Sequence, residues 1–598
     1  MLRFRTVLVL FTCLVLCCAG GFAQTAASFT TKTVSAGTQP RNLYAVDVNN
    51  DGVPDIIEDD LSLPDQFSVM LAKGDGTFAA PKTIYTFGTQ YQGVAPMVAG
   101  DFNGDGKVDL VFAMAGSNQL AVFLGNGDGT FQAPKFETIA LPSGEHFGGA
   151  YIVAADFNHD GKLDLVTEAN TNSAGAVDLI PGDGNGSFGA PQTIYTPPAN
   201  SGIGSIGVGD FDGDTNADVA VGVSSDCDQG GCSQQDVYVL YGNGDFGFST
   251  DHVYSASGQL SFSTGDVNSD GRTDIFGIGG AGNNDLVVLT SQPDRQFTTF
   301  TMPTGLTLSG TLGTAAPMVL GDFNGDGKMD LATVGFTSST SVFAVFLANG
   351  SGGYEQQTVD IGSTQEMSNP VIGDFSRDTK PDLATVWSSN AVPPTLTVAE
   401  NTTASGNWGG CAYPAKGQGI ELCSPGSTSP GSVVFSAAAN SFGPLRKIEV
   451  WVDGKKIGEQ YHVWENQGWL NLTSSLSNGK HTVTLYAANI DNTLEKITRT
   501  FEVGASGCSA PSSAGVNLCS PASGATVSSP VQVEASATVT GKLDQMELWV
   551  DGVKKDTQTS SATLNTSISL SAGTHRFAVL AVNTSGQKWE QAVDATVK

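Results

Sequence analysis

The chain has 598 residues, enough for several domains, and its 74 glycines and 15% charged residues are typical of many short strands joined by tight turns. Fifty-nine acidic residues against 28 basic ones give a formal net charge of -31 at pH 7. Nucleic-acid binding is disfavoured, because contact with phosphates requires clustered Lys and Arg that this chain lacks.

The N-terminus has the pattern of an export signal over residues 1–23. Two arginines precede an apolar run over residues 7–16, and we expect cleavage after Ala23. A membrane anchor is the alternative, but the apolar run is shorter than the ~20 residues that a spanning helix requires. The sequence therefore predicts a secreted or cell-surface protein, extracellular or periplasmic, with no membrane span after signal cleavage.

One nine-residue pattern, Asp-x-Asn/Asp/Ser-x-Asp-Gly/Thr-x-x-Asp, dominates the next 380 residues. It occurs seven times at intervals of 52 to 56 residues, starting at Asp47, Asp101, Asp156, Asp210, Asp266, Asp322 and Asp374. A fixed period of this length indicates one supersecondary unit repeated. The pattern predicts an all-β fold with a seven-bladed β-propeller over residues 24–403.

Each repeat is expected to be a four-stranded antiparallel meander. In copy two, a short strand ends at Gly100, the aspartate pattern follows, and further strands are expected over 109–114, 120–124 and 134–139. The last copy supplies only three strands, whereas residues 29–34 form a strand with no partner before the first pattern. Pairing this strand with the one that ends near residue 400 would complete the seventh blade and cover its exposed edge.

After Asn401 the period stops and two segments resemble each other. One contains KIEVWVDGKKI and the other QMELWVDGVKK, each preceded by an LCSP sequence. Strand alternation predicts two immunoglobulin-like β-sandwiches over residues 411–504 and 508–598. The same alternation turns Trp451 and Trp549 outward, and Trp464 and Trp469 add to this set. Such rings either pack against a neighbouring domain or stack on a sugar.

Six cysteines remain after loss of the leader, in three pairs that are close in sequence. An exported protein with an even number of cysteines favours disulfide bonds, and zinc is the weaker alternative because no His lies at ligand spacing. The expected pairs are Cys227 with Cys232, Cys411 with Cys423, and Cys508 with Cys519.

The aspartate pattern provides oxygen atoms at fixed positions. Side chains at positions 1, 3, 5 and 9 and the carbonyl at position 7 form a hard oxygen set, and Gly at position 6 allows a positive φ. Such a set suits Ca²⁺, which takes six to eight oxygen ligands, so we predict up to seven structural calcium ions. The predicted metal ligands are Asp47, Asn49, Asp51, Val53, Asp55, Asp101, Asn103, Asp105, Lys107, Asp109, Asp156, Asn158, Asp160, Lys162, Asp164, Asp210, Asp212, Asp214, Asn216, Asp218, Asp266, Asn268, Asp270, Arg272, Asp274, Asp322, Asn324, Asp326, Lys328, Asp330, Asp374, Ser376, Asp378, Lys380 and Asp382.

Two other interpretations of the pattern are less well supported. A helix-loop-helix calcium site needs a Glu at position 12, where copies two and three have Phe112 and Thr167. A plain Asp-Gly hairpin does not need three or four converging carboxylates, whose repulsion a cation must offset. In copies four and seven, Thr215 and Thr379 replace the glycine at position 6, and we expect these two sites to be weaker or differently shaped.

The sequence DFNGDGKVDLVFA followed by VFLGNGDGTF resembles the FG-GAP and VCBS repeat family, whose repeats build the β-propeller of integrin α subunits and of many secreted bacterial proteins. The resemblance covers about residues 27–403, and the tail is similar to bacterial immunoglobulin-like domains. It implies structural calcium in each blade loop and, often, adhesion or ligand capture by the opposite face.

The connections on that opposite face are irregular in sequence, over residues 140–151, 224–235 and 303–316. Variable loops on a regular scaffold are a usual place for binding, although they are also tolerated insertions. The chain has no HExxH and no GxSxG, so we expect no enzyme activity. We therefore expect a non-enzymatic adhesion or ligand-binding protein with an extracellular protein or glycan partner. The alternative is a carbohydrate-binding or polysaccharide-degrading protein that uses the propeller funnel or the tail tryptophans.

Overall fold

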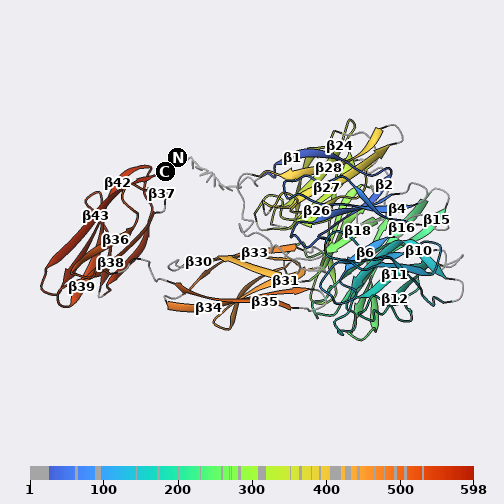
Figure 1. Cartoon of the computed structure of the whole chain (residues 1–598), viewed down its shortest axis with the longest axis horizontal. Coiled ribbons are helices and arrows are strands. Elements are labelled where there is room, and N and C mark those ends of the chain that lie inside the picture. The colour runs from blue at the N-terminus through green and yellow to red at the C-terminus, as the bar shows by residue number, and fades with distance from the viewer. Residues whose placement is uncertain are drawn as a thin grey trace, which may run out of the picture.

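The chain folds entirely as β-structure in the residues that the computed structural model describes, which confirms the predicted fold class (Figure 1). These are residues 26–598 except 61–64, 88–95, 143–144, 171–174, 199–200, 229–230, 258–259, 269, 271, 280–283, 307–317, 327, 351, 363–366, 379, 390–391, 404–418, 425–431, 441–444, 462–466, 477–478, 490–493, 504–507, 509, 528, 530 and 560.

The first 403 residues contribute seven four-stranded antiparallel sheets, which we number in chain order. Sheet one comprises β2 (Pro40–Val46), β3 (Asp55–Asp60), β4 (Gln66–Met70) and β5 (Lys82–Thr86), and sheet two comprises β6 (Met97–Gly100), β7 (Asp109–Ala113), β8 (Gln119–Phe123) and β9 (Lys135–Thr138). Sheet three comprises β10 (His146–Ala155), β11 (Asp164–Asn170), β12 (Gly175–Ile180) and β13 (Gln192–Tyr195), and sheet four comprises β14 (Gly202–Gly209), β15 (Asp218–Asp228), β16 (Gly231–Gly242) and β17 (Phe248–Ser257). Sheet five comprises β18 (Leu260–Gly265), β19 (Asp274–Gly279), β20 (Asp285–Ser291) and β21 (Phe297–Pro303), and sheet six comprises β22 (Val319–Gly321), β23 (Asp330–Phe336), β24 (Ser341–Ala348) and β25 (Tyr354–Asp360). The strands predicted for copy two match β6 to β9 to within about a residue at most ends.

Sheet seven joins the two ends of this region. It comprises β26 (Val371–Gly373), β27 (Asp382–Ser389), β28 (Val392–Asn401) and, as its fourth strand, β1 (Phe29–Ser35). The pairing is antiparallel, with Phe29 opposite Asn401 and Ser35 opposite Thr395. The predicted pairing of the first strand with the last is therefore confirmed.

Apolar side chains pack between successive sheets all the way around. Separate buried clusters join sheet one to two, two to three, and so on to sheet seven, and a further cluster joins sheet seven to sheet one through Phe375 and Phe78. The sheets thus form a closed cycle, here called the ring, which is the arrangement of a β-propeller.

The residue at position 2 of each aspartate pattern is a wedge in this packing. It is buried in every copy and, where it is Phe, its ring contacts an aromatic residue of the adjacent sheet. The centroid distance is 5.8 Å for Phe102 and Phe188, and 5.4 Å for Phe375 and Phe78. The pattern therefore shapes the packing between sheets as well as the loop.

The tail contains two further bodies, each built from two packed sheets. The first contains β29 (Gly419–Ser424), β30 (Ser432–Asn440) and β33 (Gln467–Ser475) in one sheet and β32 (Lys455–Tyr461), β31 (Leu445–Val452), β34 (Gly479–Asn489) and β35 (Leu494–Val503) in the other. The second contains β36 (Gly515–Ser520), β38 (Val531–Thr538) and β41 (Thr563–Ile568) in one sheet and β37 (Thr526–Val527), β43 (Lys588–Val597), β42 (Gly573–Asn583), β39 (Leu543–Val550) and β40 (Val553–Thr559) in the other. One buried apolar core fills each body.

The predicted disulfide between Cys508 and Cys519 is present. Cys227 and Cys232 lie directly opposite each other in the β15–β16 hairpin, which is the backbone placement that their predicted bond requires. Cys411 lies outside the described residues, so its predicted bond with Cys423 stays a prediction.

Candidate metal sites

The seven aspartate patterns form loops that connect the first two strands of each sheet, and we call them loops one to seven. Position 9 is the first residue of the second strand. In loop two, Asp109 is fully buried, and its carboxylate accepts the N–H of Phe102 at 3.1 Å and the N–H of Gly125 at 2.7 Å. It therefore fastens the loop both to itself and to the end of the third strand.

The same pair of backbone bonds recurs around the ring. Every aspartate at position 9 is buried and accepts one N–H from its own loop and one from a residue that ends the third strand or lies two positions after it. The other six are Asp55, Asp164, Asp218, Asp274, Asp330 and Asp382. A carboxylate has about four lone-pair sites. Two backbone bonds therefore leave acceptor capacity for a cation.

Position 1 organises the turn of each loop. In loop two, Asp101 accepts the N–H groups of Gly104 at 2.7 Å, Asp105 at 3.1 Å and Gly106 at 2.8 Å. The side-chain oxygen of Asn103 at position 3 accepts the N–H of Asp105 at 2.8 Å. The oxygens at positions 1 and 3 are thus held by the turn itself.

In loops one to four, position 6 has the positive φ that the sequence predicts, and Gly271 and Gly327 of loops five and six lie outside the described residues. Gly52 has a φ of 84° and Gly106 one of 78°, and Thr215 in loop four has nearly the same φ of 80°. A β-branched residue in this region is strained, as expected for copy four. Thr379 of loop seven lies outside the described residues.

A basic side chain pairs with one aspartate of each loop. In five loops this side chain is at position 7 of the loop itself and pairs with the aspartate at position 5. The pairs are Lys107 with Asp105, Lys162 with Asp160, Arg272 with Asp270, Lys328 with Asp326, and Lys380 with Asp378.

Loops one and four have Val53 and Asn216 at position 7 and take their basic partner from an adjacent sheet. Arg377, at position 4 of loop seven, lies 3.2 Å from a carboxylate oxygen of Asp51 in loop one and donates to its carbonyl at 2.6 Å.

Arg295, at the turn between β20 and β21, lies 2.7 Å from the carboxylate of Asp212 in loop four. Its guanidinium also stacks over Tyr241, 4.1 Å from the ring centroid. Position 3 of loop four is therefore linked to sheet five.

These pairs set the net charge of the loops. Loops one, two, three, five, six and seven each carry three aspartates and one basic partner, which leaves a net charge of -2. Loop four carries four aspartates and Arg295, which leaves -3. One divalent cation would balance the charge of each of the six loops.

Burial and mutual repulsion both oppose ionisation at position 9. Burial and then the loop's other carboxylates raise the pKa of Asp55 to about 8, and burial together with Asp101 and Asp105 raises the pKa of Asp109 to about 7. Burial likewise raises the pKa of Asp330 well above its ordinary value. A nearby cation would reverse this effect.

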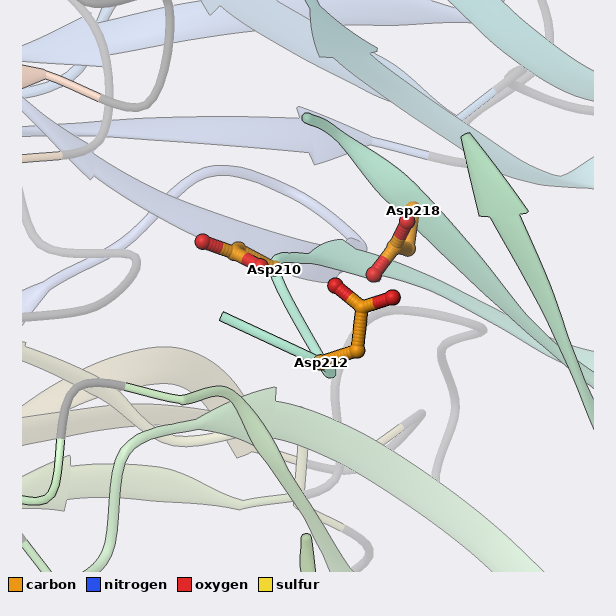
Figure 2. Close-up of side chains that lie close together, drawn as sticks. All are labelled: Asp210, Asp212 and Asp218. Atoms are coloured by element: carbon orange, nitrogen blue, oxygen red, sulfur yellow. The ribbon is translucent and has the colours of Figure 1, made fainter. Parts of the chain in front are cut away.

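Loop four brings three carboxylates closest together. Asp210 follows β14, Asp212 lies in the loop and Asp218 begins β15, and an oxygen from each lies within 4.8 Å of the others (Figure 2). In the described part of the chain this is the one group of three acidic, His or Cys side chains with that spacing. The other loops have Asn or Ser at position 3, which explains the difference.

The donor set of each loop fits a hard divalent cation. It consists of carboxylate, amide or hydroxyl oxygens at positions 1, 3, 5 and 9 and a carbonyl at position 7, without nitrogen or sulfur donors. The loop backbone already holds these oxygens in one turn. The predicted ligands thus come together loop by loop. Hydrogen bonds also link some neighbouring loops: Arg377 donates to Asp51, His159 pairs with Asn216, and Thr273 of loop five bonds with Asp210 of loop four.

Sequence reasoning missed one cluster of reactive side-chain types. On sheet four, Ser255 donates to Asp236 at 2.5 Å, and His252 Nε2 lies 3.2 Å from the same carboxylate oxygen and 3.0 Å from the Ser255 hydroxyl. Asp236 lies on β16, nearly twenty residues away in sequence, so no local motif signals the group. Both partners use the same imidazole nitrogen, so this exposed group lacks the relay through two nitrogens that activates a serine.

The outward tryptophans of the tail take part in contacts within their own domains. Trp451 is half-buried, donates from Nε1 to Glu449 at 2.8 Å and packs edge-on against Tyr486. Trp549 makes the equivalent bond to Glu547 at 2.9 Å. The predicted outward direction is confirmed, since Ile448, Val450 and Val452 of β31 are buried. Trp464 lies outside the described residues, as does the side chain of Trp469.

The irregular connections are partly described. The β15–β16 hairpin continues beyond the last residue of β15 that pairs with β14, Ser224, and reaches its tip between Asp228 and Gly231. It projects from the end of sheet four opposite loop four, because loop four precedes β15. Residues 307–317 of the third connection lie outside the described residues.

Comparison with known structures gives remote likenesses. The exotype rhamnogalacturonan lyase YesX is 14% identical, with 64% of this chain and 75% of that chain covered at a TM-score of 0.33. The α-L-arabinofuranosidase Arb93A from Fusarium graminearum is 10% identical, with 63% and 96% covered at a TM-score of 0.32. Fibronectin(III)-like modules of Clostridium thermocellum CbhA are 16% identical, with 30% and 94% covered at a TM-score of 0.14. Likenesses this remote carry no functional argument.

No curated protein matches the chain. Among the described residues, no helix has the length and apolar character to span a membrane. Family comparison matches the FG-GAP-like repeat at residues 61–112, 101–167, 266–333 and 322–385, and a bacterial Ig domain at residues 515–579. These matches show that the chain contains four FG-GAP-like repeats and a bacterial Ig domain, as the sequence resemblance indicated.

Proposed function

We propose that the protein is a secreted, calcium-stabilised, non-enzymatic adhesion or ligand-binding protein, and that it binds through the ring face opposite loops one to seven. The observation that carries the proposal is the recurrence of one oxygen-lined acidic loop in every sheet of the ring. Export is supported by the N-terminal pattern of residues 1–23 and by the family resemblance.

Calcium would be held by the side-chain oxygens at positions 1, 3, 5 and 9 and by the carbonyl at position 7. When bound, it would supply the positive charge that offsets repulsion among these carboxylates. The loops also contact the adjacent sheets: the carbonyl of Phe102 in loop two accepts the N–H of Gly186 in sheet three at 2.9 Å. An ordered loop two therefore helps to fix the position of sheet three.

The binding face is argued from the shape of sheet four. Its hairpin strands β15 and β16 have 11 and 12 residues, against five each for β7 and β8 of sheet two. The extra length projects on the face opposite the aspartate loops. The connections on that face do not share the repeated sequence pattern, so they are free to differ from sheet to sheet. A projecting hairpin closed by Cys227 and Cys232 is a suitable rigid contact for a partner.

The non-enzymatic part of the proposal is supported by chemistry. The Ser255, His252 and Asp236 group is exposed and lacks a relay through two imidazole nitrogens. The tail rings of Trp451 and Trp549 are engaged with their own domains, which supports packing over sugar stacking for these two.

Differential scanning calorimetry tests the calcium claim. A ligand that binds only the native state stabilises it by mass action, so excess EDTA should lower the unfolding temperature of the ring. The tail bodies lack the aspartate pattern and serve as an internal control, so their transition should stay in place. An unshifted ring transition would contradict the proposal.

Ligand capture tests the binding face. A glycan array and a whole-cell pulldown, each with and without calcium, should detect binding by the intact protein. Replacement of residues 225–233 by Asn-Gly should abolish capture without changing the ring transition. Retained capture that disappears with Trp464→Ala or Trp469→Ala would instead place binding in the tail and overturn the assignment.

A further inference from the structure

Glu58 is a buried acid on the face of sheet one opposite loop one. It lies in β3, its relative exposure is 0%, and no donor of a described residue reaches either carboxylate oxygen with hydrogen-bond geometry. Its neighbours differ: both oxygens of Asp59 accept bonds from Asn42, and Asp60 accepts the N–H of Thr38 at 2.8 Å. Of these three acids, only Glu58 has a carboxylate that accepts no hydrogen bond from a described residue.

Glu58 and Asp60 face the same space. They are two apart on β3, so their side chains leave the sheet on one side, while Asp59 leaves on the other. A methyl group added at Gly37 would collide with Oε1 of Glu58 and lie 3.2 Å from Oδ2 of Asp60. The missing side chain of Gly37 thus makes room for the Glu58 carboxylate beside that of Asp60, and we call this place the cradle.

The charges around this cradle are acidic. Burial first, and then the carboxylates of Asp60 and Asp59, raise the pKa of Glu58 to about 7, although the nearby Gly37 N–H lowers it in part. Among the described residues, no basic side chain lowers the pKa of Glu58, whereas Arg41 lowers that of Asp59. Buried charges in proteins are normally paired or coordinate a metal, because an unpaired one is costly.

We propose that Glu58 and Asp60 bind a calcium ion beside Gly37 and Thr38, as a cation site separate from the aspartate loops. The donors are all oxygen, from two carboxylates, the Thr38 hydroxyl and nearby carbonyls, which suits calcium and disfavours metals that prefer nitrogen or sulfur. Thr38 is exposed, so an ion has a path to the cradle from solvent.

The place of this site gives the ion a mechanical role. Residues 36–39 connect β1, the last strand of sheet seven, to β2, the first strand of sheet one. The N–H of Ala36 donates to the carbonyl of Pro394 at 3.1 Å, and the Thr38 N–H donates to Asp60. An ion held by Glu58 and Asp60 would therefore fix the segment that crosses the junction of the ring.

Calcium counting tests the site. Equilibrium dialysis followed by atomic emission should find one calcium ion fewer per chain in Glu58→Gln than in the wild type. Asp59→Asn is the matched control, because this acid is equally buried on the same strand but fully hydrogen-bonded, and its count should equal that of the wild type. The difference between variants does not depend on how many aspartate loops are filled, so failure of the loop proposal leaves this test valid.

A second variant and a local readout guard against misfolding of Glu58→Gln. Gly37→Ala places a methyl group in the cradle and should lose the same ion. Hydrogen exchange of residues 29–38 should slow on calcium addition in the wild type and in Asp59→Asn, but not in Glu58→Gln or Gly37→Ala. An unchanged count in both test variants would overturn the proposal and show that Glu58 is held as a protonated acid.

Discussion

Thr215 occupies a backbone conformation in which loops one to three have glycine. Its φ of 80° matches that of Gly106, and its N–H still donates to Asp210 at 3.0 Å, so the loop keeps its shape despite the side chain. Such a residue in left-handed backbone carries strain on the order of 1 kcal/mol or more. Loop four therefore has the expected fold at a cost in stability.

We expect Thr215→Gly to raise the free energy of unfolding of the ring by on the order of 1 kcal/mol, because the relief of strain exceeds the added entropy of the unfolded chain. Gly106→Thr is the matched change of opposite sign in loop two and should destabilise the ring by a similar amount. Thermal unfolding in calcium measures both, and a destabilised Thr215→Gly variant would contradict the strain argument.

Arg295 and Asp212 form a pair that no local pattern signals. The Asp212 side chain is only 7% exposed, whereas that of Arg295 is 39% exposed. We expect Arg295→Met to cost about 1–3 kcal/mol, since it leaves a largely buried carboxylate without its charged partner. A double-mutant cycle with Asp212→Asn should show a positive coupling energy, because the asparagine needs no counter-charge. Arg576→Met, which breaks the exposed pair with Asp594, is the control and should have little effect.

At the scale of elements, the wedge residue at position 2 links the metal loop to sheet packing. Phe102 is 2% exposed and stacks edge-on against Phe188 of the next sheet. We expect Phe102→Ala to lower the free energy of unfolding by about 3–5 kcal/mol, as for other large-to-small changes in a core. Phe136→Ala, at a ring that is 36% exposed, should cost much less. Chemical denaturation in calcium compares the two, and equal costs would show that the wedge is not a core position.

Each tail body has a hydrogen bond between a histidine and the aspartate of its WVDG turn. In the first, His481 Nδ1 lies 2.6 Å from Asp453, and in the second His575 Nδ1 lies 2.6 Å from Asp551. His575 Nε2 also lies 2.9 Å from the carbonyl of Ser571, so both ring nitrogens face acceptors and the charged form is favoured. The hydrogen bond to Asp551 is the largest cause that raises the pKa of His575, and the bond to the Ser571 carbonyl adds to it. The same hydrogen bond with His575 is the largest cause that lowers the pKa of Asp551.

The hydrogen bond between His575 and Asp551 predicts the pH dependence of the second tail body. A raised histidine pKa contributes stability that is complete below its unfolded value of about 6.5 and is lost as pH rises through the folded value. The lowered pKa of Asp551 contributes stability above about pH 4 that is lost on further acidification. The transition of the second tail body should therefore be highest between about pH 4 and 6.5 and fall as pH rises through the raised pKa of His575, and His575→Gln should remove that fall. Calorimetry of the intact chain at several pH values checks this, and an unaltered profile would contradict it.

Periodicity was enough to predict the elements, because each repeat contains its own strands and turn residues. The extent of β6 to β9 and the pairing of β1 with β28 follow from local patterns and from the strand count. The partners of loops one and four could not be predicted, because Arg377 and Arg295 reach them from other sheets. Glu58 reads as part of an exposed acidic run, DIIEDD, and only packing against the adjacent segment shows that it is buried.

At the scale of the whole molecule, β1 is the strand on which ring closure depends. Seven residues of β1 pair with β28, and Lys32 forms an ion pair with Glu400 across them. Deletion of residues 26–35 would leave β28 as an unpaired edge that is buried in the intact ring, and such edges associate with other chains. We expect this variant to form oligomers in size-exclusion chromatography with light scattering, and a peptide of residues 28–36 to restore the monomer. A stable monomer without the peptide would contradict the role of β1.

The order in which the chain is made gives this junction a further consequence. Ser28 and Thr403, which are hydrogen-bonded, lie 375 residues apart, so the first strand waits for nearly the whole ring sequence before it finds its partner. Contacts this distant in sequence slow folding, because the loop-closure entropy must be overcome before they form. The ring of a nascent chain therefore stays unclosed through most of its synthesis, and closure becomes a late step of folding that needs both ends of the ring sequence.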